Sequence, residues 1–145
     1  MTLPIAFSER IDALLAEFHV LSLSACDGTS HWAAPLFYVF DPQNARLVLV
    51  TAPATEHGAL MVRRAAVVVT VAGGSSEIGQ LRGLQMRGQV TRLPQARTDG
   101  GAVLYQQRFK VPVALSPVYW QFVPDFIKAT DNRVRFGYKE RWPSQ

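Results

Sequence analysis

The stretch 78-IGQLRGLQMRGQVTRL-93 decides the fold class of this chain. Apolar residues fall on the even positions of its second half, at Leu84, Met86 and Val90, and polar residues separate them. This alternation is typical of a β-strand with one buried and one exposed face. Leu81 lies out of phase, so Gly83 is predicted to mark a bulge or bend. A long, bent strand of this kind is what a small closed barrel needs, since ordinary strands have only about 5–6 residues.

The composition is that of a folded protein rather than a disordered chain. The chain has 145 residues, of which 48% are hydrophobic and 18% charged. We therefore expect a single domain over residues 1–145. Cys26 is the only cysteine, so no internal disulfide can form, as is usual in the cytoplasm. No apolar run approaches the ~18 residues of a membrane span, and we expect a cytoplasmic protein without a membrane partner.

The charge pattern favours a small anionic ligand over a nucleic acid. The net charge is +4 and the 15 basic residues are scattered, with Arg63–Arg64 as the only adjacent pair. A nucleic-acid groove needs a clustered basic stripe. We therefore predict a phosphate-bearing small molecule as the partner and no nucleic acid.

The patterns on either side of the long strand predict six further strands and three short helices. Ser8 and Thr55 are typical helix N-cap residues. Pro35 lies within a predicted strand and cannot donate to a ladder, so it is expected at an edge or bulge. The predicted helices cover residues 8–18, 55–64 and 94–108. The predicted strands cover 19–26, 31–40, 46–51, 66–72 and 118–130, with a last strand through 134–138. This mostly antiparallel order indicates a mainly β barrel or sandwich with short helices.

The segment Thr51–His57 gathers polar side chains where a predicted strand ends and a helix begins. Thr51, Thr55 and His57 bring two hydroxyls and an imidazole to a helix N-terminus. The free N–H groups and positive dipole of a helix start favour an anion. The alternative is that Thr55 only caps the helix while His57 is exposed to solvent.

No catalytic residue can be assigned from the sequence. The three histidines, His19, His31 and His57, have no cysteine or carboxylate companions at metal-ligand spacing, so no metal site is predicted. Nucleophile-elbow, dinucleotide-loop and phosphate-loop motifs are missing. Cys26 is interpreted as a small apolar filler, Trp120 as a core residue and Thr130-Asp131-Asn132 as a hairpin turn.

Several motifs together resemble a known superfamily. FDPQN at 40–44 and T-x3-T-x-H at 51–57 resemble the pyridoxamine 5′-phosphate oxidase-like FMN-binding split barrels. Three others are most similar to the small uncharacterised bacterial YhbP-type family: RGLQMRGQV at 82–90, QRFKVP at 107–112 and IKATDN…FGYK at 127–139. The resemblance implies a six- to seven-stranded antiparallel split barrel. It also implies a homodimer with FMN bound between the two protomers.

The resemblance further implies which residues contact the cofactor. The flavin ring would run beside Ala34, Leu36 and Tyr38, with Val50 and Thr51 at the end of the third strand. Thr55, Glu56 and His57 would stand at the phosphate, where the oxidase pattern has Ser-Arg-Lys. Gln85 lies two residues beyond the position of the oxidase glutamine and on the same side of its strand.

The function implied by this resemblance is an FMN-dependent oxidoreductase acting on an unidentified small molecule. One alternative is a non-catalytic ligand-binding or structural dimer with weak or lost flavin binding. Another is a haem-binding split barrel, in which one of the histidines would serve as axial ligand. The visible absorption spectrum of the purified protein distinguishes these three.

Overall fold

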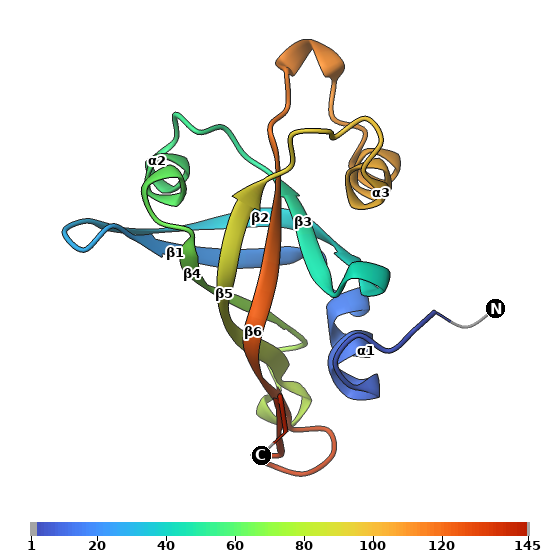
Figure 1. Cartoon of the computed structure of the whole chain (residues 1–145). Helices are drawn as coiled ribbons and strands as arrows, with labels where there is room; N and C mark the ends of the chain where they lie inside the picture. Colours follow the sequence, from blue (N-terminus) through green and yellow to red (C-terminus); the bar gives the residue numbers. More distant parts are fainter. Residues whose placement is uncertain (1–2, 145) are drawn as a thin grey trace.

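Six strands of a seven-stranded antiparallel sheet close into a barrel in the computed structural model, which describes residues 3–144, and the seventh strand is added at one edge (Figure 1). The strand order is β3-β2-β1-β4-β5-β6-β7, and an additional pairing of β3 with β6 closes the barrel. The strands are β1 (Val20–Cys26), β2 (His31–Asp41), β3 (Arg46–Val50), β4 (Ala66–Gly73), β5 (Arg82–Arg92), β6 (Tyr119–Asp131) and β7 (Lys139–Trp142). The helices are α1 (Glu9–Glu17), α2 (Glu56–Arg63) and α3 (Gly100–Phe109). The predicted split barrel with three short helices is therefore confirmed.

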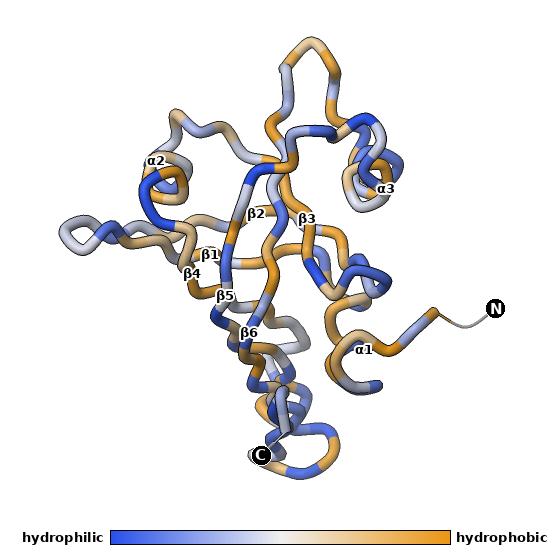
Figure 2. Tube along the Cα trace, viewed as in Figure 1, coloured by the Kyte–Doolittle hydropathy of each residue, from blue (hydrophilic) through white to orange (hydrophobic). Residues whose placement is uncertain are grey.

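The barrel interior is filled by the inward side chains predicted from the alternation in β5. Leu84, Met86 and Val90 are at most 2% exposed, and hydropathy alternates along the strand (Figure 2). Leu14 and Leu15 of α1 join the same core and cover one end of the barrel. The packing thus follows directly from the period of two in the sequence.

The strand bend lies elsewhere than predicted. Gly83 stays in register, opposite Ala72 in β4 and Thr130 in β6, so the expected bulge at Gly83 is wrong. The register shifts on β6 instead, where Arg87 pairs with Phe126 and Gly88 pairs with Pro124. Asp125 is left as the extra residue of this bulge. The inward positions of β6 therefore change from even to odd, from Trp120 and Phe122 to Ile127 and Ala129.

Three predicted boundaries also need correction. Residues 78–80 form a single 3-10 turn, and β5 begins at Arg82. The helix predicted over 94–108 begins at Gly100, because the Asp99 carboxylate accepts hydrogen bonds from the Gly101 and Ala102 N–H groups. Residues 134–138 form a turn rather than a strand, and the last strand follows at Lys139.

The barrel wall is split along one edge of β2. β3 pairs only with Tyr38–Asp41, whereas residues 31–37 pair with β1 alone. Pro35 lies in this unpaired part, as its missing N–H predicts. After β3 the chain leaves the sheet and forms α2, which packs against β1 and β2. The backbone edge of residues 31–37 is therefore free of strand hydrogen bonds on this side.

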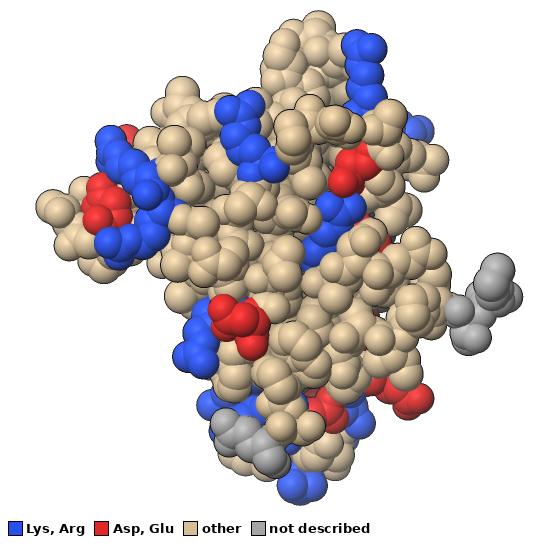
Figure 3. Space-filling view, in the orientation of Figure 1, with Lys and Arg blue, Asp and Glu red and all other residues tan. Residues whose placement is uncertain are grey.

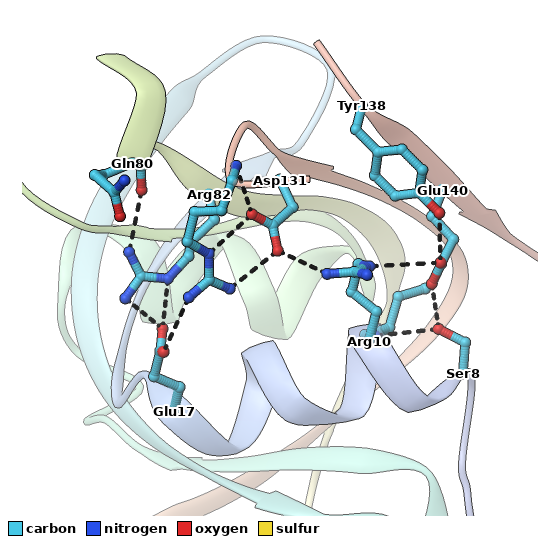
Figure 4. Close-up of polar contacts among 10 residues, drawn as sticks. Ser8, Arg10, Glu17, Gln80, Arg82, Asp131, Tyr138 and Glu140 are labelled. Carbon is cyan, nitrogen blue, oxygen red and sulfur yellow. Dashed lines mark hydrogen bonds and ion pairs between the residues drawn. The ribbon is translucent and has the colours of Figure 1, made fainter. Parts of the chain in front are cut away.

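A network of charged residues attaches α1 to the far end of the barrel (Figure 4). Asp131 is 1% exposed and accepts hydrogen bonds from the guanidinium groups of Arg133 and Arg10, each at 2.9 Å. Glu17 at the end of α1 pairs with Arg82 of β5 at 2.8 Å. The hairpin turn predicted at Thr130-Asp131-Asn132 begins only at Asn132, because Thr130 and Asp131 are the last residues of β6. Within residues 3–144, no helix is long and apolar enough to cross a membrane.

Candidate functional site

Thr51, the first residue after β3, is held firmly by its backbone. Its N–H donates to the carbonyl of Val118 at 3.1 Å, and its own carbonyl accepts from Nε1 of Trp120 at 2.9 Å. Trp120 is 2% exposed, which confirms its prediction as a core residue. The indole therefore fixes the point at which the chain leaves the barrel wall.

The connection from Thr51 to α2 is a tight, hydrogen-bonded turn. Thr55 caps the helix as predicted: its hydroxyl accepts from the Gly58 N–H at 3.0 Å and donates to the Ala52 carbonyl at 2.8 Å. A Cβ atom at Gly58 would lie 2.2 Å from the Ala52 oxygen and 2.7 Å from Oγ1 of Thr55. Glycine is required here because the backbone of 52–55 passes directly against the helix start.

His57 points into the protein toward the two threonines. Its Nε2 atom lies 2.6 Å from Oγ1 of Thr51 and 3.3 Å from Oγ1 of Thr55. The side chain is 8% exposed, and burial lowers the pKa of His57 below its usual 6.5, so the imidazole is neutral at pH 7. The alternative of a solvent-exposed histidine is thus wrong. The structure does bring the two hydroxyls and the imidazole together.

The β2 residues proposed to line a flavin ring point inward. Ala34 pairs with Leu23 and Leu36 pairs with Leu21, and both of these leucines are core residues. Tyr38 is 1% exposed and its hydroxyl donates to the Leu15 carbonyl at 2.8 Å. The side chains of Ala34, Leu36 and Tyr38 therefore face the barrel interior rather than the open edge.

The backbone of β2, by contrast, faces outward at the free edge. The Tyr38 N–H donates to the His19 carbonyl on the β1 side. Because hydrogen-bonding direction alternates along an antiparallel strand, Leu36 and Ala34 also face β1. The N–H and C=O groups of Ala33 and Phe37, together with the Pro35 carbonyl, point to the unpaired edge. The position of Pro35 at a strand edge was predicted from the sequence, but the extent of the free edge over residues 31–37 was not.

The remaining predicted site residues lie apart from this edge. Gln85 is exposed and belongs to the outer face of the sheet, opposite Thr70 and Lys128. It is thus on the other face from Ala34 and Leu36 within one copy of the chain. Val50 is half-buried at the end of β3, and Glu56 is exposed in the first turn of α2.

The charges around the start of α2 do not gather into a cationic site. Glu56 places a carboxylate in the first turn, whereas Arg63 lies in the last turn of α2 and pairs with Asp27 at 3.1 Å. Hydrogen bonds from Ser30 and Thr29 N–H groups lower the pKa of Asp27, so its carboxylate is ionised opposite Arg63. Among residues 3–144, no group of three or more histidine, cysteine or carboxylate side chains could hold a metal ion.

Two polar groupings were missed in the sequence. Half-buried Cys26 accepts a hydrogen bond from the Gly28 N–H at 3.2 Å and lies 3.7 Å from Nε2 of His31. Arg46, 6% exposed, pairs with Asp41 at 2.9 Å and with Asp99 at 2.8 Å, which ties α3 to β3. The separation of Asp41 and Arg46 by a turn was the only signal for this second grouping, because Asp99 is distant in sequence.

Comparison with known proteins gives both a sequence relative and fold relatives. The chain is 35% identical over 132 residues to the UPF0306 protein YhbP of Escherichia coli O157:H7, covering 91% of this chain and 90% of that protein. An FAD-binding protein of Mesorhizobium loti matches with a TM-score of 0.63 at 18% identity, covering 83% of this chain and 89% of that one. A pyridoxamine 5′-phosphate oxidase-like protein of Listeria innocua matches with a TM-score of 0.68 at 18% identity, covering 83% and 95%. No family model matches the chain.

Proposed function

Because the chain belongs to the UPF0306 family, of which YhbP is a member, and has the fold of flavin-binding split barrels, we propose that it binds a flavin at the free edge of β2. The observation that carries this proposal is the unpaired backbone of residues 31–37 in β2, a strand that packs against α2. When bound, the flavin would supply the redox chemistry, and the protein would be an oxidoreductase of a small molecule.

The chemistry of the free edge suits the ring of a flavin. The pyrimidine part of that ring has amide-like N–H and C=O groups, which are complementary to backbone groups. The edge offers N–H and C=O groups at Ala33 and Phe37, while Pro35 offers only a carbonyl. An exposed strand edge with unsatisfied backbone groups is a ready template for such pairing. The ring is therefore recognised by backbone and not by the side chains of Ala34, Leu36 and Tyr38.

The phosphate end of FMN fits less well. The first N–H groups of α2 and the Thr55 hydroxyl can hydrogen-bond to phosphate oxygens. However, Glu56 is a carboxylate, His57 is neutral, and Arg63 is paired with Asp27. A phosphate dianion would thus gain hydrogen bonds but no opposite charge from these residues, so we propose that the ring provides most of the affinity.

We also propose that the protein acts as a homodimer in the cytoplasm. The outer face of the sheet carries the exposed apolar side chains Phe37 and Val68, which are 52% and 51% exposed. Between them lie the small exposed residues Ser22, Ser24, Ala33 and Pro35, which permit close approach of a second copy. Gln85 lies on this same outer face, so a partner that covers it would bring Gln85 into the interface.

The proposal is tested by adding FMN and riboflavin to the purified protein and following flavin fluorescence. Ala33→Pro removes one N–H from the free edge and none from the pairing with β1, so flavin affinity should fall about tenfold. Ala33→Ser keeps the N–H and is the matched control. If neither FMN nor riboflavin binds, the proposal is overturned. A haem spectrum of the purified protein would support the haem alternative instead.

A further inference from the structure

Residues of α1, of α3 and of the end of β2 line a cavity of about 630 Å³. These two helices lie on the side of the barrel away from α2 (Figure 1). The cavity volume is in the range of small-molecule sites, which is about 300–1,000 Å³. Its floor is formed by Leu15 of α1 and by the end of β2. Its rims are formed by the two helices and by residues 3–5. The cavity uses β2 at Tyr38, Val39 and Phe40, beyond the free edge of residues 31–37.

The floor of this cavity is apolar. Leu15, Tyr38 and Val39 are 1%, 1% and 7% exposed, and all three line it. The Tyr38 hydroxyl donates its hydrogen bond to the Leu15 carbonyl, so it is not free to donate to water in the cavity. At the rim, Leu104 and Ile5 are 43% and 59% exposed. Water against these surfaces gains few hydrogen bonds, so an apolar ligand body is favoured there.

The charged side chains at the rim differ in whether they already form hydrogen bonds or ion pairs within the protein. On the α1 side, the Asp12 carboxylate accepts hydrogen bonds from the N–H groups of Ala6 and Phe7, at 2.8 and 3.1 Å. On the α3 side, Arg108 lines the cavity with its guanidinium over the ring of Phe109, 5.6 Å from the ring centre. None of the ion pairs among residues 3–144 includes Arg108. Among the described residues, the cavity thus offers one cation, Arg108, and, besides the hydrogen-bonded Asp12, one carboxylate, Glu9, that take part in no ion pair.

Electrostatics agree with this placement of the cation. Burial raises the pKa of the Tyr38 hydroxyl, and the positive charge of Arg108 acts against that rise. Arg108 is therefore close enough to affect a group on the cavity floor. Glu9, on the opposite rim, is also a lining residue and would repel a second acid group on the same ligand.

We propose that the α1–α3 cavity is a second ligand site, which binds an apolar molecule with a single anionic group directed to Arg108. The apolar body would lie over Val39 and between the exposed side chains of Ile5 and Leu104. The acid group would receive charge-assisted hydrogen bonds from the guanidinium. This site is separate from the flavin site and does not depend on it.

The proposal is tested with two fluorescent dyes of similar shape, anionic anilinonaphthalene sulfonate and neutral N-phenylnaphthylamine. Both should bind to the folded protein. Arg108→Gln should weaken the anionic dye about tenfold and leave the neutral dye within about twofold, because only the charged contact is lost. Arg141→Gln removes an exposed cation on β7 and is the matched control. Ala16→Trp, at the cavity wall, should abolish binding of both dyes.

Each other outcome contradicts the proposal. If Ala16→Trp leaves both dyes bound while its thermal melt is unchanged, the dyes bind elsewhere. If Arg108→Gln weakens both dyes equally, the arginine contributes packing and the ligand is not an anion. If FMN or riboflavin displaces the dyes, the cavity is part of the flavin site. If neither dye binds, the second site is overturned. If the dyes bind but no flavin binds, only the proposed function is overturned.

Discussion

The Nε2 atom of His57 lies 2.6 Å from the Oγ1 atom of Thr51, which turns the imidazole of the second α2 residue toward the barrel. A residue that the sequence suggested as a phosphate ligand is thus engaged in holding β3 to α2. Its neutral state follows from burial, and the hydroxyl partner compensates for the loss of water.

This geometry predicts a stability that falls at mildly acidic pH. The folded-state pKa of His57 is below the unfolded value of about 6.5, so the unfolded chain binds the proton more readily. The contribution is fully present above pH 6.5 and decreases as the pH falls below it. Urea melts should show this decrease in the natural protein and a smaller one in His57→Gln. An equal pH dependence in both would contradict the burial of a neutral imidazole.

The charge network at the far end of the barrel predicts a second, more acidic transition. Hydrogen bonds from Arg133, with Arg10 also contributing, lower the pKa of Asp131 from 3.8 to about 2. A lowered carboxylate pKa stabilises the folded state above the unfolded pKa, and this contribution is lost as the pH falls from about 4 to about 2. The shift corresponds to about 2 kcal/mol. Asp131→Asn should lose this amount at pH 7, whereas Asp125→Asn, an exposed control, should lose little.

The close approach of strands predicts which glycines cannot be replaced. A Cβ atom at Gly88 would lie 2.2 Å from the Val123 carbonyl oxygen, and one at Gly83 would lie 2.5 Å from the Val71 oxygen. Gly88→Ala and Gly83→Ala should each reduce the free energy of unfolding by about 1–3 kcal/mol, because backbone must move. Gly79→Ala is the control, since its Cβ would meet nothing within 4 Å. If Gly88→Ala and Gly83→Ala change the free energy of unfolding no more than Gly79→Ala does, the strands can shift without loss of stability.

If the flavin proposal holds, riboflavin and FMN should bind with affinities within about tenfold of each other. The start of α2 offers hydrogen bonds but no free cation, so the phosphate adds little. Glu56→Gln should improve FMN binding and leave riboflavin unchanged, because it removes a carboxylate from the first helical turn. Strong discrimination in favour of FMN would place the phosphate near a cation elsewhere, and fluorescence titration of both flavins decides this.

The proposed dimer should be disrupted by a charge on the outer face of the sheet. Light scattering of the natural chain should give twice its 16.1 kDa mass, and Val68→Asp should give the single mass. Val113→Asp, at a residue that is 78% exposed on the turn before β6, is the control. An interface of about 2,000 Å² or more would be expected for an obligate dimer. A natural chain that is monomeric at micromolar concentration would exclude it.

Much of the fold was predictable because local patterns and long-range packing agree. Leu84, Met86 and Val90 alternate in the sequence and face the core, and Ser8 and Thr55 cap the helices as their side chains suggest. The bend could not be located, because a bulge is a relation between two strands. Its position is set by the register in which Gly88 of β5 pairs with Pro124 of β6. Uncharged surface separates small groups of acidic and basic side chains on the face shown in Figure 3, in line with the scattered charges of the sequence.

The candidate site was predictable only in part. The meeting of Thr51, Thr55 and His57 follows from a strand end followed closely by a helix cap, and all three lie in one short segment. The direction in which the imidazole points depends on burial by the rest of the barrel, which spacing does not reveal. The α1–α3 cavity and the free edge of β2 arise from segments far apart in the chain. The cavity has no local motif, and Pro35 is the only local signal for the free edge.

The extra residue in β6, Asp125, determines which side chains in the second half of that strand face the core. Before it, β6 pairs with β3 through residues 119–122, and after it the strand pairs with β7 through residues 127–130. If one residue were deleted at this point, every later side chain would change face. Ile127 and Ala129 would leave the core, and the Asp131 carboxylate would turn away from Arg10. The attachment of α1 therefore depends on the number of residues in β6 as much as on their identity. A family member could substitute Asp125 but could not delete it.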